Sequence, residues 1–302
     1  MLKIYQLIII VLIILFFLFH SYYYLKVNNE IEILQLDNPT KSILEETLNK
    51  KSPFIITNLL INWSFIKDLN LELLKQNYGD KKVTLNNSII EQNKTMKINQ
   101  TLGEYIEWLN NTEGKDTNNM NVYLAENDDL LSNTKLMEKI KKETSILNCP
   151  LNLVNTYPLW IGHNHSKTGL HYDTDTRNFL CQLRGQKKVY LFPPNQSKYL
   201  YPSSKFDSGA KCSQVNFWDV NTEKFPLFNQ SKYIEIILSP GQILYIPPYW
   251  WHCMENIGTN ISISVRSEPI STIFIKLPEI LKLIGHRLKL VGHNNCTCCN
   301  NH

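Results

Sequence analysis

The stretch from Lys167 to Phe192 reads KTGLHYDTDTRNFLCQLRGQKKVYLF and decides the fold of this chain. It places His171 and Asp173 two residues apart, ahead of two apolar-alternating runs, Phe179 to Leu183 and Lys188 to Phe192. In an extended strand, residues i and i+2 project to the same face. An imidazole and a carboxylate at the mouth of this strand can therefore converge on one ion.

A second imidazole lies far downstream, at the end of Gly241 to His252 (GQILYIPPYWWH), directly after a predicted strand and a Pro-rich turn. This placement is expected if two distant strands close around one pocket. Two histidines and one carboxylate form the facial triad of non-haem Fe(II) oxygenases, which leaves coordination positions open for other ligands. We therefore take His171, Asp173 and His252 as candidate iron ligands.

Short apolar runs bounded by Gly, Pro and Asn follow one another through the second half of the chain. They comprise Leu159 to Ile161, Phe179 to Leu183, Lys188 to Phe192, Tyr233 to Leu238, Ile243 to Ile246 and Ile261 to Val265. This spacing is typical of a sandwich or a closed jelly roll. We predict a mainly β fold, a double-stranded β-helix of the cupin-like type with flanking α-helices.

The first half of the chain has a mixed pattern. Predicted strands cover Phe54 to Thr57, Lys82 to Leu85 and Val122 to Leu124. Predicted helices cover Ser64 to Gln76 and Thr101 to Leu109, the second with a capping box formed by Thr101 and Glu104. A further amphipathic helix is expected over Pro278 to Leu290, where it could pack on the domain or form a homodimer with a second subunit.

The extreme N-terminus predicts a membrane anchor. Leu7 to Phe19 is unbroken hydrocarbon, and Ile4 to Leu25 (residues 4–25) approaches the ~20 residues of a spanning helix, with Tyr22 to Tyr24 where an interfacial aromatic belt would lie. The small-residue pattern of a cleavage site is missing, which favours an uncleaved, single-pass signal anchor. We expect a lumenal catalytic domain, in the endoplasmic reticulum or secretory pathway.

Five segments result from these patterns. We expect an anchor over residues 1–26, an N-terminal mixed part of the catalytic domain over 27–149 and the barrel core over 150–270. A C-terminal amphipathic helix over 271–293 and a Cys-rich tail over 294–302 follow. At 302 residues, one large domain with short appendages is the leading interpretation.

Charge and cysteine content restrict the partners only partly. With 31 basic and 27 acidic residues the formal net charge is +4. The sequence contains no run of five or six Lys or Arg residues, so no nucleic-acid partner is expected. Seven cysteines leave the redox compartment open, because an odd number leaves one thiol unpaired in an oxidising compartment. The tail sequence Cys-Thr-Cys-Cys lacks the spaced pairs of a structural zinc site.

Many ordered motifs carry a resemblance to a known family. They include Pro53-Phe-Ile-Ile, Trp63, Tyr78-Gly-Asp, Thr168, Asn178-Phe-Leu-Cys-Gln, Gly185-Gln-Lys, Phe192-Pro-Pro, Tyr201-Pro, Phe225-Pro, Pro240-Gly and Ile246-Pro-Pro-Tyr-Trp-Trp-His252. From about Pro53 to Ser267 the chain resembles the JmjC or cupin-like Fe(II)/2-oxoglutarate oxygenases. It is most similar to the small hydroxylase branch typified by the asparaginyl hydroxylase of hypoxia-inducible factor.

The resemblance implies a 2-oxoglutarate site beside the iron ligands. Lys187 would pair with the distal carboxylate of the co-substrate, which agrees with the need of a dianion for a fixed cation, although Lys188 next to it could face inward instead. Thr168 and Tyr123 would offer hydroxyls to the same carboxylate, and Asn178 matches a further contact. At the position where the family often has Asn, this chain has Arg266, which could bind the co-substrate or point outward.

These features favour an Fe(II)- and 2-oxoglutarate-dependent hydroxylase acting on a protein or peptide side chain. Hydroxylation of a small molecule or an RNA base is one alternative, and the missing basic stripe disfavours RNA. A non-catalytic cupin-like scaffold at the membrane is another alternative, and the complete triad disfavours it. Histone demethylation, known in the family at large, is disfavoured because no reader domain or nuclear targeting run accompanies the barrel.

Overall fold

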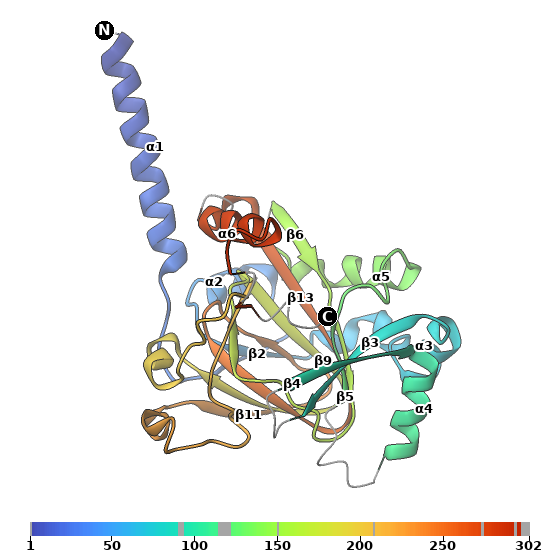
Figure 1. Cartoon of the computed structure of the whole chain (residues 1–302). Coiled ribbons are helices and arrows are strands. Elements are labelled where there is room, and N and C mark those ends of the chain that lie inside the picture. The colour runs from blue at the N-terminus through green and yellow to red at the C-terminus, as the bar shows by residue number, and fades with distance from the viewer. Residues whose placement is uncertain are drawn as a thin grey trace.

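The computed structural model describes residues 2–89, 94–113, 122–149, 151–207, 209–272, 275–292 and 295–296. A β-barrel of jelly-roll type forms its centre, with helices at its margins (Figure 1). The predicted mainly β, cupin-like architecture with flanking helices is confirmed. The strands are β1 Leu34–Asp37, β2 Phe54–Thr57, β3 Lys82–Ile89, β4 Lys94–Thr101, β5 Val122–Asn127, β6 Asn152–Thr156, β7 Leu159–Gly162, β8 His171–Asp173, β9 Arg177–Phe192, β10 Ala210–Cys212, β11 Ile234–Leu238, β12 Ile243–Tyr245 and β13 Trp251–Pro269.

Two long strands, β9 and β13, organise the sheet. They pair antiparallel from Trp251 opposite Phe192 to Ser267 opposite Arg177, with an irregularity near Ile261. The main path of the sheet runs β1-β2-β12-β9-β13-β7-β5-β3-β4, and β8, β10, β11 and β6 branch from it. The two predicted runs Phe179 to Leu183 and Lys188 to Phe192 are thus parts of one strand, β9, which continues through Gly185.

The described helices are α1 Leu2–Leu25, α2 Lys41–Leu48, α3 Leu71–Tyr78, α4 Leu102–Thr112, α5 Lys135–Glu143 and α6 Leu277–Arg287. Helix α1 extends away from the barrel, whereas α2 to α5 pack against the sheet (Figure 1). The capping box predicted from Thr101 and Glu104 is present at the start of α4, which buries Tyr105, Ile106 and Leu109. The apolar core between the sheet and α2 to α5 is continuous and includes Phe54, Phe65 and Phe179.

The predicted helix over Ser64 to Gln76 is wrong as a single element. A 3-10 turn covers Ser64–Lys67, and α3 starts separately after Asn70, whose side chain accepts a hydrogen bond from the backbone N–H of Leu73. An Asn side chain that caps a helix start requires extended backbone at its own position. The apolar spacing is the same on both sides of Asn70, so it does not reveal that the helix is interrupted there.

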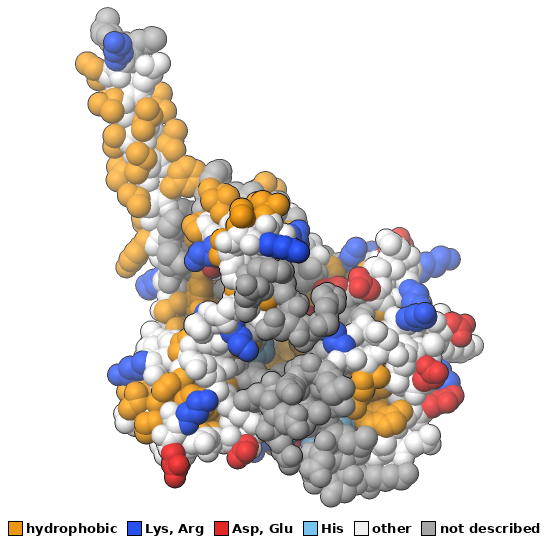
Figure 2. Space-filling model, viewed as in Figure 1, with side chains coloured by type: hydrophobic (Ala, Val, Ile, Leu, Met, Phe, Trp, Pro, Cys, Tyr) orange, Lys and Arg blue, Asp and Glu red, His pale blue; other side chains and the backbone are white. Residues whose placement is uncertain are grey.

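The predicted membrane anchor is also wrong. Residues Leu2–Leu25 form one helix, α1, on which most of the described apolar side chains are exposed (Figure 2). Of the helices in the described part of the chain, none combines the length and the apolar character that crossing a bilayer requires. The unbroken apolar run from Leu7 to Phe19 is shorter than the ~20 residues of a spanning segment. The lumenal placement of the barrel depended on this anchor and is withdrawn with it.

The C-terminal region after β13 is described in part. Helix α6 leaves Leu281, Ile284 and Leu288 exposed, and a homodimer through this helix stays a prediction. Most of the predicted Cys-rich tail, including Cys298 and Cys299, lies outside the described residues. Cys296 is described and buried, in an isolated bridge with Phe206.

Substitution of two glycines, Gly185 and Gly258, tests how closely the backbones of β9 and β13 approach each other. Gly185 and Gly258 both have left-handed φ, +67° and +75°. A Cβ at Gly185 would lie 2.5 Å from the Thr259 carbonyl oxygen, whereas a Cβ at Gly258 would meet nothing within 4 Å. We expect Gly185→Ala to lower the free energy of unfolding by roughly 1–3 kcal/mol more than Gly258→Ala, measured by urea unfolding. Equal losses would show that backbone strain alone acts at Gly185.

Candidate metal centre

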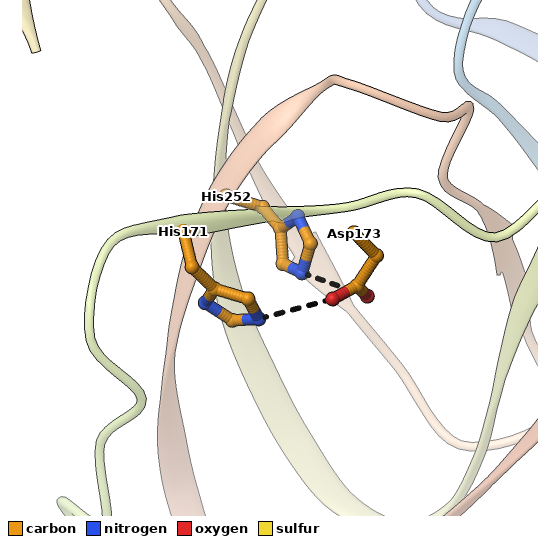
Figure 3. Close-up of side chains that lie close together, drawn as sticks. All are labelled: His171, Asp173 and His252. Carbon is orange, nitrogen blue, oxygen red and sulfur yellow. Dashed lines mark ion pairs between the residues drawn. The ribbon is translucent and has the colours of Figure 1, made fainter. Parts of the chain in front are cut away.

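Three predicted ligands converge at one end of the barrel. His171 and Asp173 are the first and last residues of β8, and His252 lies at the start of β13, directly opposite His171 in the ladder. Nε2 of His171 lies 3.7 Å from Oδ1 of Asp173, and Nε2 of His252 lies 3.7 Å from Oδ2 (Figure 3). One donor atom from each side chain lies within 4.8 Å of the other two, so the three could hold one metal ion.

Hydrogen bonds orient both imidazoles for this role. Nδ1 of His171 lies 2.8 Å from the Gly169 carbonyl oxygen, and Nδ1 of His252 lies 3.0 Å from that of Trp250. Because a carbonyl only accepts, each Nδ1 carries the proton and each Nε2 presents its lone pair to the shared space. Burial, reinforced by His171, lowers the pKa of His252 to about 4, so this imidazole is neutral at physiological pH.

The Asp173 carboxylate is buried and held from its other side. Its Oδ2 accepts a hydrogen bond of 2.9 Å from Nδ2 of Asn178 and lies 3.6 Å from Nη2 of Arg266. Burial alone would raise the pKa of Asp173, but His171, His252, Arg266 and Asn178 outweigh it and keep that pKa below its usual value. Two imidazole nitrogens and one anionic oxygen ligand fit a divalent ion such as Fe(II).

Lys187 lies inside the barrel, which answers the question of which lysine faces inward. Its side chain is 2% exposed, and its Nζ donates to Tyr123 Oη at 2.9 Å and to Asn256 Oδ1 at 2.7 Å. Lys188 instead forms a 2.8 Å ion pair with Glu235 and is partly exposed. In the described part of the chain, no carboxylate forms an ion pair with Lys187, and burial lowers the pKa of its ammonium to about 7.

A buried cation with only neutral partners is suited to an anion, because desolvation penalises an ammonium that lacks a counter-charge. One pocket contains both this lysine and the two histidines of the triad. All five residues predicted to contact the co-substrate line it. The lining comprises Tyr123, Trp160, Thr168, His171, Asn178, Leu180, Lys187, Ile246, His252, Met254, Ser264 and Arg266.

Arg266 does not point outward but lines the pocket, and its contact with the co-substrate stays a prediction. Its guanidinium lies beside Asp173 and 3.6 Å from Asp175 Oδ2, and it forms an ion pair with Glu126. Burial acts to lower the pKa of Arg266, but Asp173, Glu126 and Asp175 outweigh it and raise that pKa. The arginine is therefore occupied by carboxylates of the chain itself and steadies the ligand carboxylate of Asp173.

Thr168 lies at the pocket wall with its hydroxyl oxygen engaged. This oxygen accepts a 3.0 Å hydrogen bond from the Met254 backbone N–H, so the hydroxyl proton can still be donated to a ligand. Trp160 also lines the pocket, whereas Trp250 and Trp251 are fully buried.

Sequence reasoning missed Asn256, which holds Lys187. A signal for it existed: His252, Met254 and Asn256 alternate along β13, so all three project to the pocket face. It also missed Glu126 and Asp175, the partners of Arg266. Glu126 has left-handed φ of +55° within an irregular stretch of β5, and no sequence pattern predicts that its carboxylate turns toward β13.

Comparison with known proteins places these features in a family. The family model for the Cupin-like domain matches residues 40–266. The chain is similar to JmjC domain-containing protein D of Dictyostelium discoideum (30% identical, covering 78% of this chain and 56% of the relative). It is also similar to Lysine-specific demethylase 8 of Xenopus tropicalis (27% identical, 79% and 53%) and to HSPB1-associated protein 1 of Homo sapiens (34% identical, 36% and 22%).

The chain spans about half the length, or less, of these relatives. The family match nevertheless extends over both the barrel and the segment that precedes it, and it includes all three residues of the triad. The chain therefore belongs to the cupin-like JmjC oxygenase family.

Proposed function

We propose that this protein is an Fe(II)- and 2-oxoglutarate-dependent dioxygenase that hydroxylates a side chain of a protein or peptide. The observation that carries the proposal is a single pocket lined by both histidines of a two-histidine, one-carboxylate set and by the buried Lys187 ammonium, whose hydrogen-bond partners are neutral. A metal site alone suits many functions. The added cation suits a co-substrate that chelates the metal by one end and presents a carboxylate at the other.

The proposed roles follow from the contacts. His171, Asp173 and His252 would hold Fe(II), which when bound supplies the chelation of 2-oxoglutarate and the activation of dioxygen. Lys187 would pair with the distal carboxylate, and Tyr123 and Thr168 would donate hydroxyl protons to it. Asn178 and Arg266 keep Asp173 ionised and oriented.

The apolar walls of the pocket would exclude water from the reacting centre. Trp160, Leu180 and Ile246 line it between the two polar ends. In such a site, the fixed charges act with less screening than in water. The protein would thus orient the ligands, balance their charges and exclude water, whereas the metal, the co-substrate and dioxygen would supply the oxidising power.

The names of the relatives support a protein substrate without choosing the reaction. One relative is named as a lysine-specific demethylase and another as a protein associated with HSPB1. Hydroxylation of a carbon is also the first step of oxidative removal of a methyl group from nitrogen. The proposal therefore concerns hydroxylation, and release of formaldehyde from a methylated peptide would identify demethylation.

Loss of a triad residue tests the proposed activity. We expect full-length protein to develop a charge-transfer absorption when Fe(II) and 2-oxoglutarate are added without oxygen, and to form succinate when air is admitted. Asp173→Ala should lower succinate formation by at least ~100-fold, because it removes the anionic ligand. Asp219→Ala, which removes an exposed carboxylate of the same type, should leave it unchanged. If wild type forms no succinate and shows no absorption, the dioxygenase proposal is wrong.

Lys187→Met tests the anchor for the co-substrate. We expect the Kd of the Fe(II) protein for 2-oxoglutarate, measured anaerobically from the charge-transfer absorption, to rise by about 10- to 100-fold, since a charged hydrogen bond is lost. Lys188→Met removes a neighbouring lysine that is paired with Glu235 and should change the Kd little. Equal effects of the two substitutions would argue against an inward role for Lys187.

The affinity for 2-oxoglutarate should also depend on pH. Burial lowers the pKa of free Lys187 to about 7, so the ammonium is charged below that pH and loses its proton above it. Because only the charged form attracts a carboxylate, the Kd should rise as the pH increases beyond about 7. The Lys187→Met protein should lack this dependence. A wild-type Kd that stays constant from neutral to alkaline pH would contradict it.

A further inference from the structure

We propose that the open edge of strand β6 is a docking site for an extended segment of the substrate protein, which would pair with β6 as an added strand beside the metal centre. This inference rests on the proposed function only in taking a peptide as substrate. Extended peptides commonly bind by adding a strand to an exposed sheet edge, where main-chain hydrogen bonds supply affinity.

The free edge of β6, on the side away from β13, lies in line with the end of strand β5. Strand β7 lies between β13 and β5, and the β5 pairing ends at Asn127 opposite Leu159. Strand β6 continues the line of β7 and pairs with β13, with Thr156 opposite Arg266 and Val154 opposite Glu268. Among the strands of the described ranges, β6 has no second neighbour. No described strand therefore occupies the place that a longer β5 would take.

The direction of the peptide groups of β6 follows from the ladder. The Ser264 N–H of β13 donates to the Pro158 carbonyl at 2.9 Å. Because hydrogen-bonded pairs alternate in an antiparallel ladder, Thr156 and Val154 direct their N–H and C=O groups toward β13, and Asn155 directs its own away from it. The Tyr157 N–H, two residues beyond Asn155, donates to the Asp128 carboxylate on the same outer side, which agrees with this alternation.

This edge is continuous with the metal centre. Thr156 lies directly opposite Arg266, whose Nη2 is 3.6 Å from Asp173, and directly opposite residues project to the same face of a sheet. A strand added beside β6 would lie roughly 10 Å, or two strand spacings, from the Arg266 backbone. Alternate side chains of that strand would therefore point to the face on which the pocket opens.

The chemistry along the edge fits a peptide with an apolar side chain and a basic one. Leu151, Val154 and Ile270 are 83%, 50% and 54% exposed and could contact apolar side chains. Three exposed carboxylates, Glu126, Asp128 and Asp129, gather where β5 ends, and Arg266 pairs with Glu126. Burial and the neighbouring Glu126 raise the pKa of Asp128, so a lysine or arginine of the peptide would relieve this crowding.

Proline at position 155 provides a selective test. Asn155→Pro removes the outward N–H and blocks the edge, whereas the hydrogen bonds from Val154 and Thr156 to β13 remain, since proline is tolerated on edge strands with its nitrogen toward solvent. Asn155→Ala is the matched control, because it removes the side chain and keeps the N–H. Full-length protein loaded with redox-inert Ni(II) would be used to select binders from a displayed library of random peptides.

The expected result is that selected peptides, once synthesised, bind wild type and Asn155→Ala within about twofold of each other and bind Asn155→Pro at least about tenfold more weakly. They should also slow hydrogen exchange in residues 152–156 of the wild type, a readout that does not depend on how the proline variant folds. Basic residues should be enriched among them, and this preference should weaken in Asp128→Asn.

Three outcomes would overturn the docking proposal. In the first, no peptide is selected. In the second, the selected peptides bind Asn155→Pro as tightly as Asn155→Ala. In the third, they slow hydrogen exchange in another part of the chain but not in residues 152–156. Because Ni(II) supports no turnover, these results stand apart from the succinate assay. An inactive enzyme with a protected β6 edge would contradict the proposed reaction and leave the docking site in place.

Discussion

The antiparallel register between β9 and β13 is the constraint on which the rest of the site depends. It sets Lys187 opposite Asn256 and Arg266 opposite Asn178, and the short pairing of β13 with β8 sets His252 opposite His171. A slip of one residue would turn every one of these side chains to the other face of the sheet. Gly185 and the irregularity near Ile261 fit two strands of unequal length into this one register. The metal ligands, the buried cation and part of the pocket wall therefore follow from the pairing of β13 with β9 and β8.

Charge balance inside the barrel is the second determinant. Asp173 is compensated within the chain by Arg266 and Asn178, so its carboxylate stays ionised before any metal arrives. Lys187 has only the neutral partners Tyr123 and Asn256, and its ammonium pays a desolvation penalty that a bound anion would remove. The charge of Asp173 is therefore balanced by the chain itself, whereas Lys187 would gain a counter-charge only from a bound ligand. This difference favours a ligand that carries an anionic group to Lys187.

Period-two patterns explain what could be predicted from the sequence. They located β2, β9 and β13 and brought His171 and Asp173 to one face, and the same rule applied along β13 would have found Asn256. The features that were missed depend on backbone irregularity: Glu126 reaches Arg266 from a left-handed position in β5, and Asn70 divides a helix that apolar periodicity alone joins. The anchor prediction failed on a different ground: among the described helices, none combines the length and the apolar character that a bilayer span requires.

Specificity for a substrate has to arise outside the elements that this register controls. The triad and Lys187 belong to β8, β9 and β13, whose geometry the proposed metal and co-substrate would restrict. Strands β5 and β6 carry neither a metal ligand nor the buried ammonium. Tyr123 of β5 lines the same pocket, and Glu126 of β5 and Thr156 of β6 are partners of Arg266, which also lines it. Their lengths can change without disturbing the ladder of β9 with β13. The point where β5 stops and β6 continues is thus where the proposed reaction centre and a recognition surface can meet in one sheet.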